Sequence, residues 1–265
     1  MTFPVDAFDL TPADVPISTT DDVVVKLIHE DAADIHVVSA ARVSTLGEEV
    51  MAELESLGLI TPEQWRTKEM TQRDSGLINF LTRDRHGSPF EHNSMTFFIQ
   101  APIFVFREFH RHRVGWSYNE ESGRYKELAS EFYLPGRDRP LQQVGKPGAY
   151  QYVAGTEEQY RVMEEELMAT YLQAWKSYQR MLGVGIAREV ARLSLPVGVL
   201  SSMYATCNAR SLMHFLGLRT QHEAAKVPSF PQREIAMVAE KMEAEWAALM
   251  PLTYEAFNRN GRVAP

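Results

Sequence analysis

The strongest pattern in this 265-residue chain is a set of apolar residues over 160–181 that repeats at steps of three and four. Its members are Tyr160, Met163, Leu167, Tyr171, Ala174, Tyr178 and Met181. This spacing places them on one face of an α-helix, which must be covered by other parts of the chain. A second stretch begins at Pro231 and repeats the pattern with Ile235, Val238, Met242, Trp246 and Leu249. We therefore predict two long amphipathic helices that pack against a core.

Strands are predicted where β-branched and aromatic residues gather, at 23–28, 96–100 and 200–206. Further helices are predicted at 31–43, around 50–57, after an N-cap at Ser75, from Pro102 through Arg113, at 186–195 and at 209–218. Thr61-Pro62 predicts another helix start, 86–89 a turn and 135–155 a loop. The predicted fold class is α/β (α+β type), with a modest central sheet and long flanking helices.

We find no internal repeat and no convincing domain boundary. Residues 1–20 are predicted to form an extended arm because prolines interrupt them, and 21–265 to form a single domain. Within that domain, 45–74 lacks a strong apolar face and is interpreted as a peripheral insertion.

Charge and cysteine content exclude several classes of protein. The formal net charge is −8, so no overall positive field attracts the chain to nucleic acid or to an anionic membrane. Cys207 is the single cysteine, which excludes an internal disulfide and fits a reducing compartment. The acidic, proline-containing start does not resemble a secretory signal, and no stretch is long and apolar enough to span a membrane. We expect a cytoplasmic protein.

The densest polar stretch is 107–124, REFHRHRVGWSYNEESGR, in which guanidinium, imidazole and hydroxyl groups alternate with two carboxylates. Guanidinium groups match the geometry of phosphate, and in a helix Arg107 and Arg111 would share a face. A solvated charged surface is an equally simple interpretation by composition. We favour a binding site because the stretch directly follows 101–106, an apolar segment that should be buried.

A second polar group lies at 208–219, where the helical spacing places Arg210 and His214 on one face. Arg219 comes at the end of this predicted helix, where a cation also interacts favourably with the helix dipole, so a purely structural role stays open. Phe90-Glu91-His92 forms a third group, although a single histidine is more often structural. Cys207 follows an apolar run and is interpreted as buried and inert.

Several well-known site patterns do not occur in the sequence. No HExxH or Cys/His pattern indicates a metal site, and no Gly-rich Rossmann or P-loop motif indicates a nucleotide site of those kinds. The GxSxG motif of the α/β-hydrolases does not occur either.

Taken together, the three groups closely resemble the flavin-dependent thymidylate synthases (the ThyX family). The matching segments are RHRVGWSYNEESGRY at 111–125, FEH at 90–92 and NARSLMHFLGLR at 208–219, in the order the family has them. In the family, seven residues separate the RHR triplet from the following serine. Here eight residues separate Arg113 from Ser122, and we assign the extra one to Gly115-Trp116. Glu108 also stands where many members have Gln.

The resemblance implies two groups of ligand contacts. FAD would be contacted by Ser94, Arg111, His112, Arg113, Glu120, Asn208, Arg210 and His214, with Ser44 and His92 nearby. The nucleotide substrate would be contacted by Glu108, Arg111, Glu120, Glu121, Ser122, Gly123, Arg124, Arg192 and Arg219. Arg219 matches the catalytic arginine that polarises the pyrimidine and favours loss of its N3 proton. No metal is implied.

The implied reaction is reductive methylation of dUMP to dTMP in a homotetramer with shared active sites. NADPH would reduce FAD, methylenetetrahydrofolate would supply the carbon, and no cysteine nucleophile would be needed. A related methylation of UMP is an alternative, since the two substrates differ only at the sugar 2′ position. A non-catalytic nucleotide- or RNA-binding protein is a further alternative, which the acidic isoelectric point of about 5.5 disfavours.

Overall fold

The computed structural model describes residues 16–59, 61, 64, 68–146 and 149–265. Its contacts divide the chain into two compact units. Unit 1 comprises 1–22, 101–106 and 121–201, and unit 2 comprises 23–100, 107–120 and 202–265. Mixed helix and sheet confirms the predicted fold class. Among the described residues, no helix is long and apolar enough to cross a membrane.

A four-stranded sheet has the strand order β2-β3-β8-β4. The strands are β2 (Val24–Asp31), β3 (Ser94–Pro102), β8 (Leu200–Cys207) and β4 (Trp116–Glu120). β2 pairs antiparallel with β3, and β4 pairs antiparallel with β8. The three predicted strands are confirmed as β2, β3 and β8. β4 was not predicted, because charged and polar residues conceal its alternation of partly buried and exposed positions.

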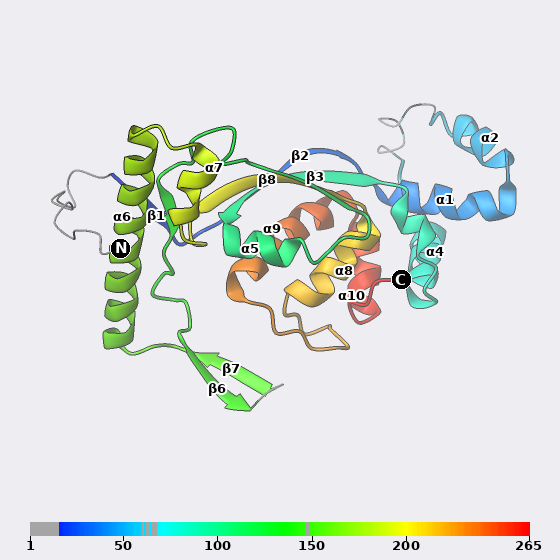
Figure 1. The fold of residues 1–265 in the computed structure, drawn as a ribbon. Coiled ribbons are helices and arrows are strands. Elements are labelled where there is room, and N and C mark those ends of the chain that lie inside the picture. Colours follow the sequence, from blue (N-terminus) through cyan, green and yellow to red (C-terminus); the bar gives the residue numbers. More distant parts are fainter. Residues whose placement is uncertain (1–15, 60, 62–63, 65–67, 147–148) are drawn as a thin grey trace. The chain divides into compact units, whose positions relative to one another are not determined.

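The helices of unit 2 lie on one side of its strands and at one end of them (Figure 1). They are α1 (Asp34–Leu46), α2 (Glu49–Ser56), α4 (Gln72–Arg83), the 3₁₀ turn η2 (Ser88–Glu91), α8 (Ala209–Arg219), α9 (Arg233–Leu249) and α10 (Pro251–Arg259). Its core contains fully buried Phe97, Phe109, Phe215 and Trp246, and the rings of Phe109 and Phe215 stack at 4.7 Å. This stack joins the polar stretch 107–124 to α8.

Unit 1 is organised around α6 (Glu157–Gly183), the long helix in Figure 1, which confirms the strongest sequence prediction. Its buried face packs on Phe132 and Val199, with Tyr171, Trp175 and Tyr178 at the centre. A capping box of Thr156 and Gln159 begins the helix. The remaining elements are β1 (Ser18–Thr20), β5 (Glu131–Tyr133), β6 (Gln142–Lys146), β7 (Ala149–Val153), α7 (Arg188–Ala191) and the 3₁₀ turn η3 (Arg192–Ser194).

Three sequence predictions are wrong in detail. The predicted loop over 135–155 contains the antiparallel hairpin of β6 and β7. The helix expected from Pro102 through Arg113 is the shorter α5 (Ile103–Phe109), and Pro102 ends β3 instead. Helix α4 begins one turn before the expected N-cap at Ser75, because Thr71 and Asp74 form a reciprocal capping box.

Other predictions lie partly outside the described residues. The arm at 1–20 is described only from residue 16, and 18–20 pair with β5 as a strand. Of the helix start at Thr61-Pro62, Pro62 falls outside the described residues. The peripheral nature of 45–74 stays a prediction.

The cap of α4 can be tested directly. Thr71→Ala removes the hydroxyl that accepts from the backbone N–H of Asp74 at 3.2 Å, so we expect the free energy of unfolding to fall by about 1 kcal/mol. Ser75→Ala, at the position predicted from sequence, is the control and should change it by less than about 0.5 kcal/mol. Urea unfolding followed by circular dichroism measures both, and equal losses would contradict the assignment of the cap to Thr71.

Candidate functional site

The RHR triplet lies in the loop that joins α5 to β4. Because α5 ends at Phe109, Arg107 and Arg111 do not share a helix face, which corrects the expectation for this segment. The Tyr118 hydroxyl on β4 lies within hydrogen-bond distance of the carbonyl oxygens of Phe109, at 3.0 Å, and His112, at 2.8 Å. It can donate to either, so Tyr118 holds both ends of the turn. Arg111 and Arg113 are exposed beside it.

The same loop is fastened to the first turn of α8. Asn208 caps this helix, and its Oδ1 accepts from the backbone N–H of Ser211 at 2.9 Å. The Ser211 hydroxyl in turn donates to the carbonyl oxygen of Val114 at 2.9 Å. Gly115 has φ +69°, and a Cβ atom there would lie 2.1 Å from Ser211 Oγ. Only glycine therefore satisfies both the backbone conformation and the close approach.

Val114 is held at the tip of the loop with 88% of its surface exposed. Arg111 and Arg113 both precede it in the sequence, so the loop presents an exposed apolar side chain next to two cations. That combination suits a flat ligand with an apolar ring and anionic groups.

Arg219, at the end of α8, forms hydrogen bonds with two residues of the polar stretch 107–124. Its Nη1 donates to Glu108 Oε2 at 2.5 Å, and its Nε donates to His112 Nε2 at 3.1 Å. All three side chains are partly buried. The structure therefore brings Arg219 to two residues that precede it by more than a hundred positions, and Arg219 has a role beyond the helix dipole.

The charges in this triad are defined by the contacts. Because His112 Nε2 accepts from Arg219, its ring is neutral and carries its proton on Nδ1. Burial, with the nearby charges of Arg219 and His214, lowers the pKa of His112 to about 4. Burial also raises the pKa of the Glu108 carboxyl, an effect that Arg219 opposes and Glu234 reinforces. At neutral pH the triad holds one guanidinium against one carboxylate and one neutral imidazole.

Arg210, on the first turn of α8, is fixed from three directions. Its Nε donates to the carbonyl oxygen of Pro265 at 2.6 Å, and its Nη1 donates to Glu91 Oε1 at 2.5 Å. Its guanidinium lies so close to Gly87 that a Cβ atom there would be 2.5 Å from it. The predicted proximity of Arg210 and His214 is confirmed, since partial burial and then the Arg210 charge lower the pKa of His214.

Asn93 connects the Phe90-Glu91-His92 segment to α8. Its Oδ1 accepts from the backbone N–H of Ala209 at 2.8 Å, and its Nδ2 donates to the carbonyl oxygen of Phe90 at 3.0 Å. His92 and Ser94, on either side of Asn93, are exposed. Ser44 is exposed near the end of α1, and its place beside a flavin stays a prediction.

Of the remaining candidates, Glu120 is the partly buried last residue of β4 in unit 2, whereas the others belong to unit 1, around a turn at 121–126. The backbone N–H groups of Tyr125 and Lys126 both donate to the carbonyl oxygen of Ser122, at 3.0 and 3.2 Å. A Cβ atom on buried Gly123 would lie 3.2 Å from Arg192 Cδ, so the Arg192 stem runs along the turn. The structure thus brings Arg192 to this turn, although the two are far apart in the sequence.

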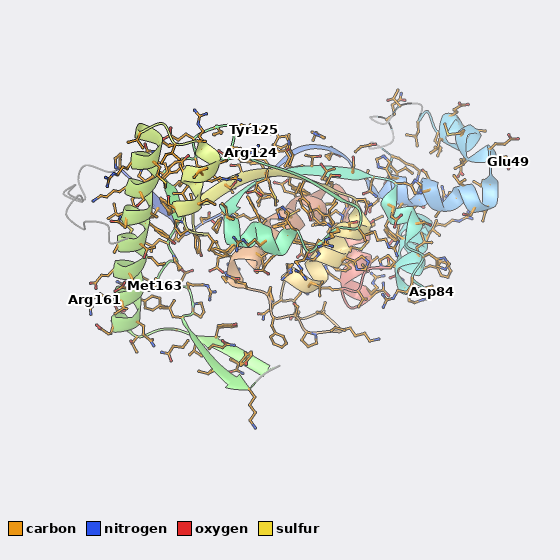
Figure 2. The ribbon with its side chains drawn as sticks, viewed as in Figure 1. Glu49, Asp84, Arg124, Tyr125, Arg161 and Met163 are labelled. Carbon is orange, nitrogen blue, oxygen red and sulfur yellow. The ribbon has the colours of Figure 1, made fainter. Side chains whose placement is uncertain are left out.

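The charges of this turn are paired within unit 1. Arg124 Nε donates to Glu189 Oε2 at 2.8 Å, and Lys126 pairs with Glu121 at 2.8 Å. The Arg124 guanidinium lies 5.8 Å from the ring centre of Tyr125, whose side chain is 79% exposed, and Figure 2 shows the two residues next to each other. The turn offers a hydroxyl, two guanidiniums and an aromatic face to a ligand.

Burial decides the interpretation of the single cysteine. Cys207 is buried, and burial raises the pKa of its thiol, which confirms the inert interpretation. No group of three or more His, Cys, Asp or Glu suited to a metal ion occurs in the part of the chain that the structure describes.

A pocket of about 360 Å³ lies in the segment after Arg219, and the residues that line it include Gln221, His222 and Phe230.

Sequence reasoning missed several residues that build this site. Tyr118, Asn93 and Gly87 act through tertiary contacts and carry no charge or spacing signal of their own. Tyr118 could have been found from the alternation in WSYNE over 116–120, which places it on the partly buried face of a strand. The sequence places Gly115 in the polar stretch, but nothing in it indicates that its close neighbour is Ser211 of α8.

Comparisons with known proteins cover most of the chain. A model of the family described as thymidylate synthase complementing protein matches residues 26–252. A flavin-dependent thymidylate synthase of Streptomyces avermitilis is 64% identical over 256 residues, which is 96% of this chain and 99% of that protein. One of Tropheryma whipplei is 51% identical over 244 residues, which is 92% of this chain and 95% of that protein.

Solved structures give the same result. The UMP/dUMP methylase PolB from Streptomyces cacaoi bound with 5-Br dUMP is 50% identical, with a TM-score of 0.83, and covers 94% of this chain and 100% of that chain. The same protein bound with 5-Br UMP is 49% identical with a TM-score of 0.81, over 94% of this chain and 99% of that one.

The docking of the RHR loop on α8 predicts the effect of one added methyl group. Gly115→Ala is expected to destabilise the protein by about 1–3 kcal/mol, because it combines an unfavourable positive φ with a clash against Ser211 Oγ. Ser211→Ala removes the clashing oxygen, so the double variant should recover part of that loss relative to the sum of the single variants. Thermal unfolding of the four proteins measures the coupling, and strictly additive losses would contradict the contact.

Proposed function

Because the chain belongs to the flavin-dependent thymidylate synthase family and is a methyltransferase of that family, we propose that it converts dUMP to dTMP by reductive methylation. Methylenetetrahydrofolate is the proposed carbon donor, and NADPH-reduced FAD the proposed hydride source. Family membership removes the basis for a non-catalytic nucleotide- or RNA-binding protein.

The observation that carries this proposal is the fixed position of Arg219. C5 of uracil is a weak nucleophile, and negative charge on the N3–C4–O4 edge raises its electron density. A guanidinium held in place by Glu108 and His112 supplies donors to that edge without having to reorganise during the reaction. Such a preorganised donor contributes on the order of 3 kcal/mol to the stabilisation of developing charge. The neutral ring of His112 leaves the positive charge at this point to Arg219.

The residues of unit 2 fit a flavin coenzyme. The loop tip exposes Val114 for contact with a flat ring, and Arg111, Arg113 and Arg210 supply cations for its phosphates. Gly115 and Asn208 determine how the loop approaches the first turn of α8. When bound, FAD supplies the hydride chemistry that no side chain of the protein can perform. The protein itself would hold and orient the coenzyme and the substrate and would polarise the pyrimidine.

Unit 1 supplies the proposed contacts to the phosphate of the nucleotide. Ser122 offers a hydroxyl, Arg124 and Arg192 offer guanidiniums at the same turn, and Gly123 leaves room for the Arg192 stem. A phosphate would compete with Glu189 for Arg124, because both are anions that accept from the same fork. We assign Ser122 to the phosphate and not to a nucleophilic role, because hydrogen bonding to phosphate explains its presence without requiring a paired general base.

The finer details of the proposal come from the resemblance to the family. NADPH and methylenetetrahydrofolate are the proposed co-substrates, and the pocket after Arg219 falls within the size range of small-molecule sites. We also propose a cytoplasmic homotetramer with shared active sites. Gel filtration with light scattering tests the tetramer.

UMP is the second candidate substrate, and the related UMP/dUMP methylase supports it, since that protein is bound with 5-Br UMP in one structure and 5-Br dUMP in another. Steady-state assays on flavin-loaded protein with dUMP and with UMP separate the two. We expect a higher kcat/KM for dUMP, and methylation seen by mass spectrometry at C5 of the pyrimidine. A clear preference for UMP would overturn the choice of substrate, and a purified protein that takes up no FAD would overturn the flavin-dependent reaction.

Arg219→Ala tests the central residue. We expect kcat to fall by about 100-fold or more, because a donor to the developing charge is lost while the flavin contacts of Arg111 and Arg210 remain. Absorbance of the bound flavin should be retained. Arg259→Ala, an exposed arginine on α10, is the control and should leave kcat unchanged. A normal rate in Arg219→Ala would contradict the assignment of Arg219 to the pyrimidine and would favour a structural role at the end of α8.

A further inference from the structure

The segment 261–265, which follows α10, packs along α8. Gly261 has φ +80° and Arg262 has φ +55°, and these two left-handed residues turn the chain back from the end of α10. Arg262 and Ala264 are 3% and 5% exposed. A non-glycine residue in this conformation is held only where surrounding contacts compensate its strain.

The contacts that hold Arg262 are those of a buried guanidinium with no direct access to a ligand. It forms a two-pronged pair with Glu243 of α9, at 2.6 and 2.8 Å, and its Nη1 also donates to Asn258 Oδ1 at 2.7 Å. Its Nη2 donates to Thr220 Oγ1 at 2.8 Å. Of these contacts, the one to Thr220 leads to the site, since Thr220 is the C-cap of α8 and directly follows Arg219.

Thr220 transmits this contact to the last turn of α8. Its hydroxyl donates to the carbonyl oxygen of Leu216 at 2.8 Å, and its backbone N–H donates to the same oxygen at 3.0 Å. The end of the helix is therefore closed by a residue whose hydroxyl is fixed by Arg262. The carbonyl oxygen of Arg262 also lies 3.0 Å from where a Cβ atom on Gly217 would be, so the segment touches the helix one turn earlier.

The other end of the segment contacts the first turn of α8. The carbonyl oxygen of Pro265 accepts from Arg210, and that of Ala264 accepts from Arg85 Nη1 at 2.8 Å. Arg210 and Arg219 lie about 13 Å apart along the helix, at a rise of roughly 1.5 Å per residue. One short segment thus contacts the helix beside both arginines that the proposed function assigns to ligands.

We propose that Arg262 is a positioning residue, which sets the last turn of α8 through Thr220 and thereby holds Arg219 where it meets the pyrimidine. This inference rests on the proposed function, because it assigns Arg219 to the nucleotide. Arg262 itself touches neither substrate nor cofactor. Its buried pair with Glu243 supplies the rigidity, and the Thr220 hydroxyl supplies the connection.

Thr220→Val tests the connection while leaving the Arg262–Glu243 pair in place. The valine has nearly the same shape but accepts no hydrogen bond, so we expect kcat/KM for dUMP to fall by about ten-fold through loss of alignment of Arg219. The dissociation constant of dUMP, measured by calorimetry on flavin-loaded protein, should rise in parallel. The absorbance spectrum of the bound flavin should be unchanged, since Arg210 keeps its own contacts.

Two variants separate positioning from general destabilisation. Thr220→Ser retains the hydroxyl and should restore kcat/KM to within about two-fold of the unmodified protein. Asn258→Ala removes a different hydrogen bond from the same guanidinium, at 2.7 Å, and is the matched control. It should lower the melting temperature to an extent similar to Thr220→Val, without loss of dUMP binding.

The outcomes distinguish the inference from the proposed function. Equal kinetics in Thr220→Val and Asn258→Ala, or a Thr220→Ser variant as impaired as Thr220→Val, would overturn the positioning role while the unmodified protein remains active. An unmodified, flavin-loaded protein that methylates neither dUMP nor UMP would overturn the proposed function itself.

Discussion

The hydrogen bond between the RHR loop and the first turn of α8 is the constraint on which the unit 2 part of the site depends. The Ser211 hydroxyl binds the Val114 carbonyl, and this contact brings the loop so close to the helix that position 115 must be glycine. Because Arg219 lies on the same rigid helix, a displacement of the loop also changes its position relative to Glu108 and His112. One helix therefore sets the relative positions of the candidate groups in this unit.

The charge at residue 108 also follows from this arrangement. A glutamine would accept the same hydrogen bond from Arg219, but a carboxylate forms a charge-assisted bond that is shorter and stronger. Glu108 thus holds the guanidinium firmly in the absence of ligand. Burial works against this, because it raises the pKa of the carboxyl and disfavours its charged form. Arg219 makes the ionised form of Glu108 tolerable in this partly buried position.

Local patterns in the sequence were sufficient where one face of an element determines its structure. The apolar steps over 160–181 predicted α6, and the spacing of Arg210 and His214 predicted their proximity on α8. Tertiary contacts left no such pattern. Nothing in the spacing of Arg219 indicates that its partners are Glu108 and His112. The hairpin of β6 and β7 was missed because the polar residues and the glycine of β6 (QQVGK) are typical of loops, although β7 (AYQYV) has the composition of a strand.

The register of β4 limits where the chain can hold the one extra residue that the resemblance to the family implies. Trp116 to Glu120 pair with Cys207 to Met203 in an unbroken antiparallel ladder. A residue inserted within this strand would reverse the faces of all that follow, and Tyr118 would lose its contacts to the RHR loop. The strand cannot absorb an insertion, whereas the loop before it can turn at Gly115 with a positive φ. We therefore expect the added residue in the loop, where it leaves the register of the sheet intact.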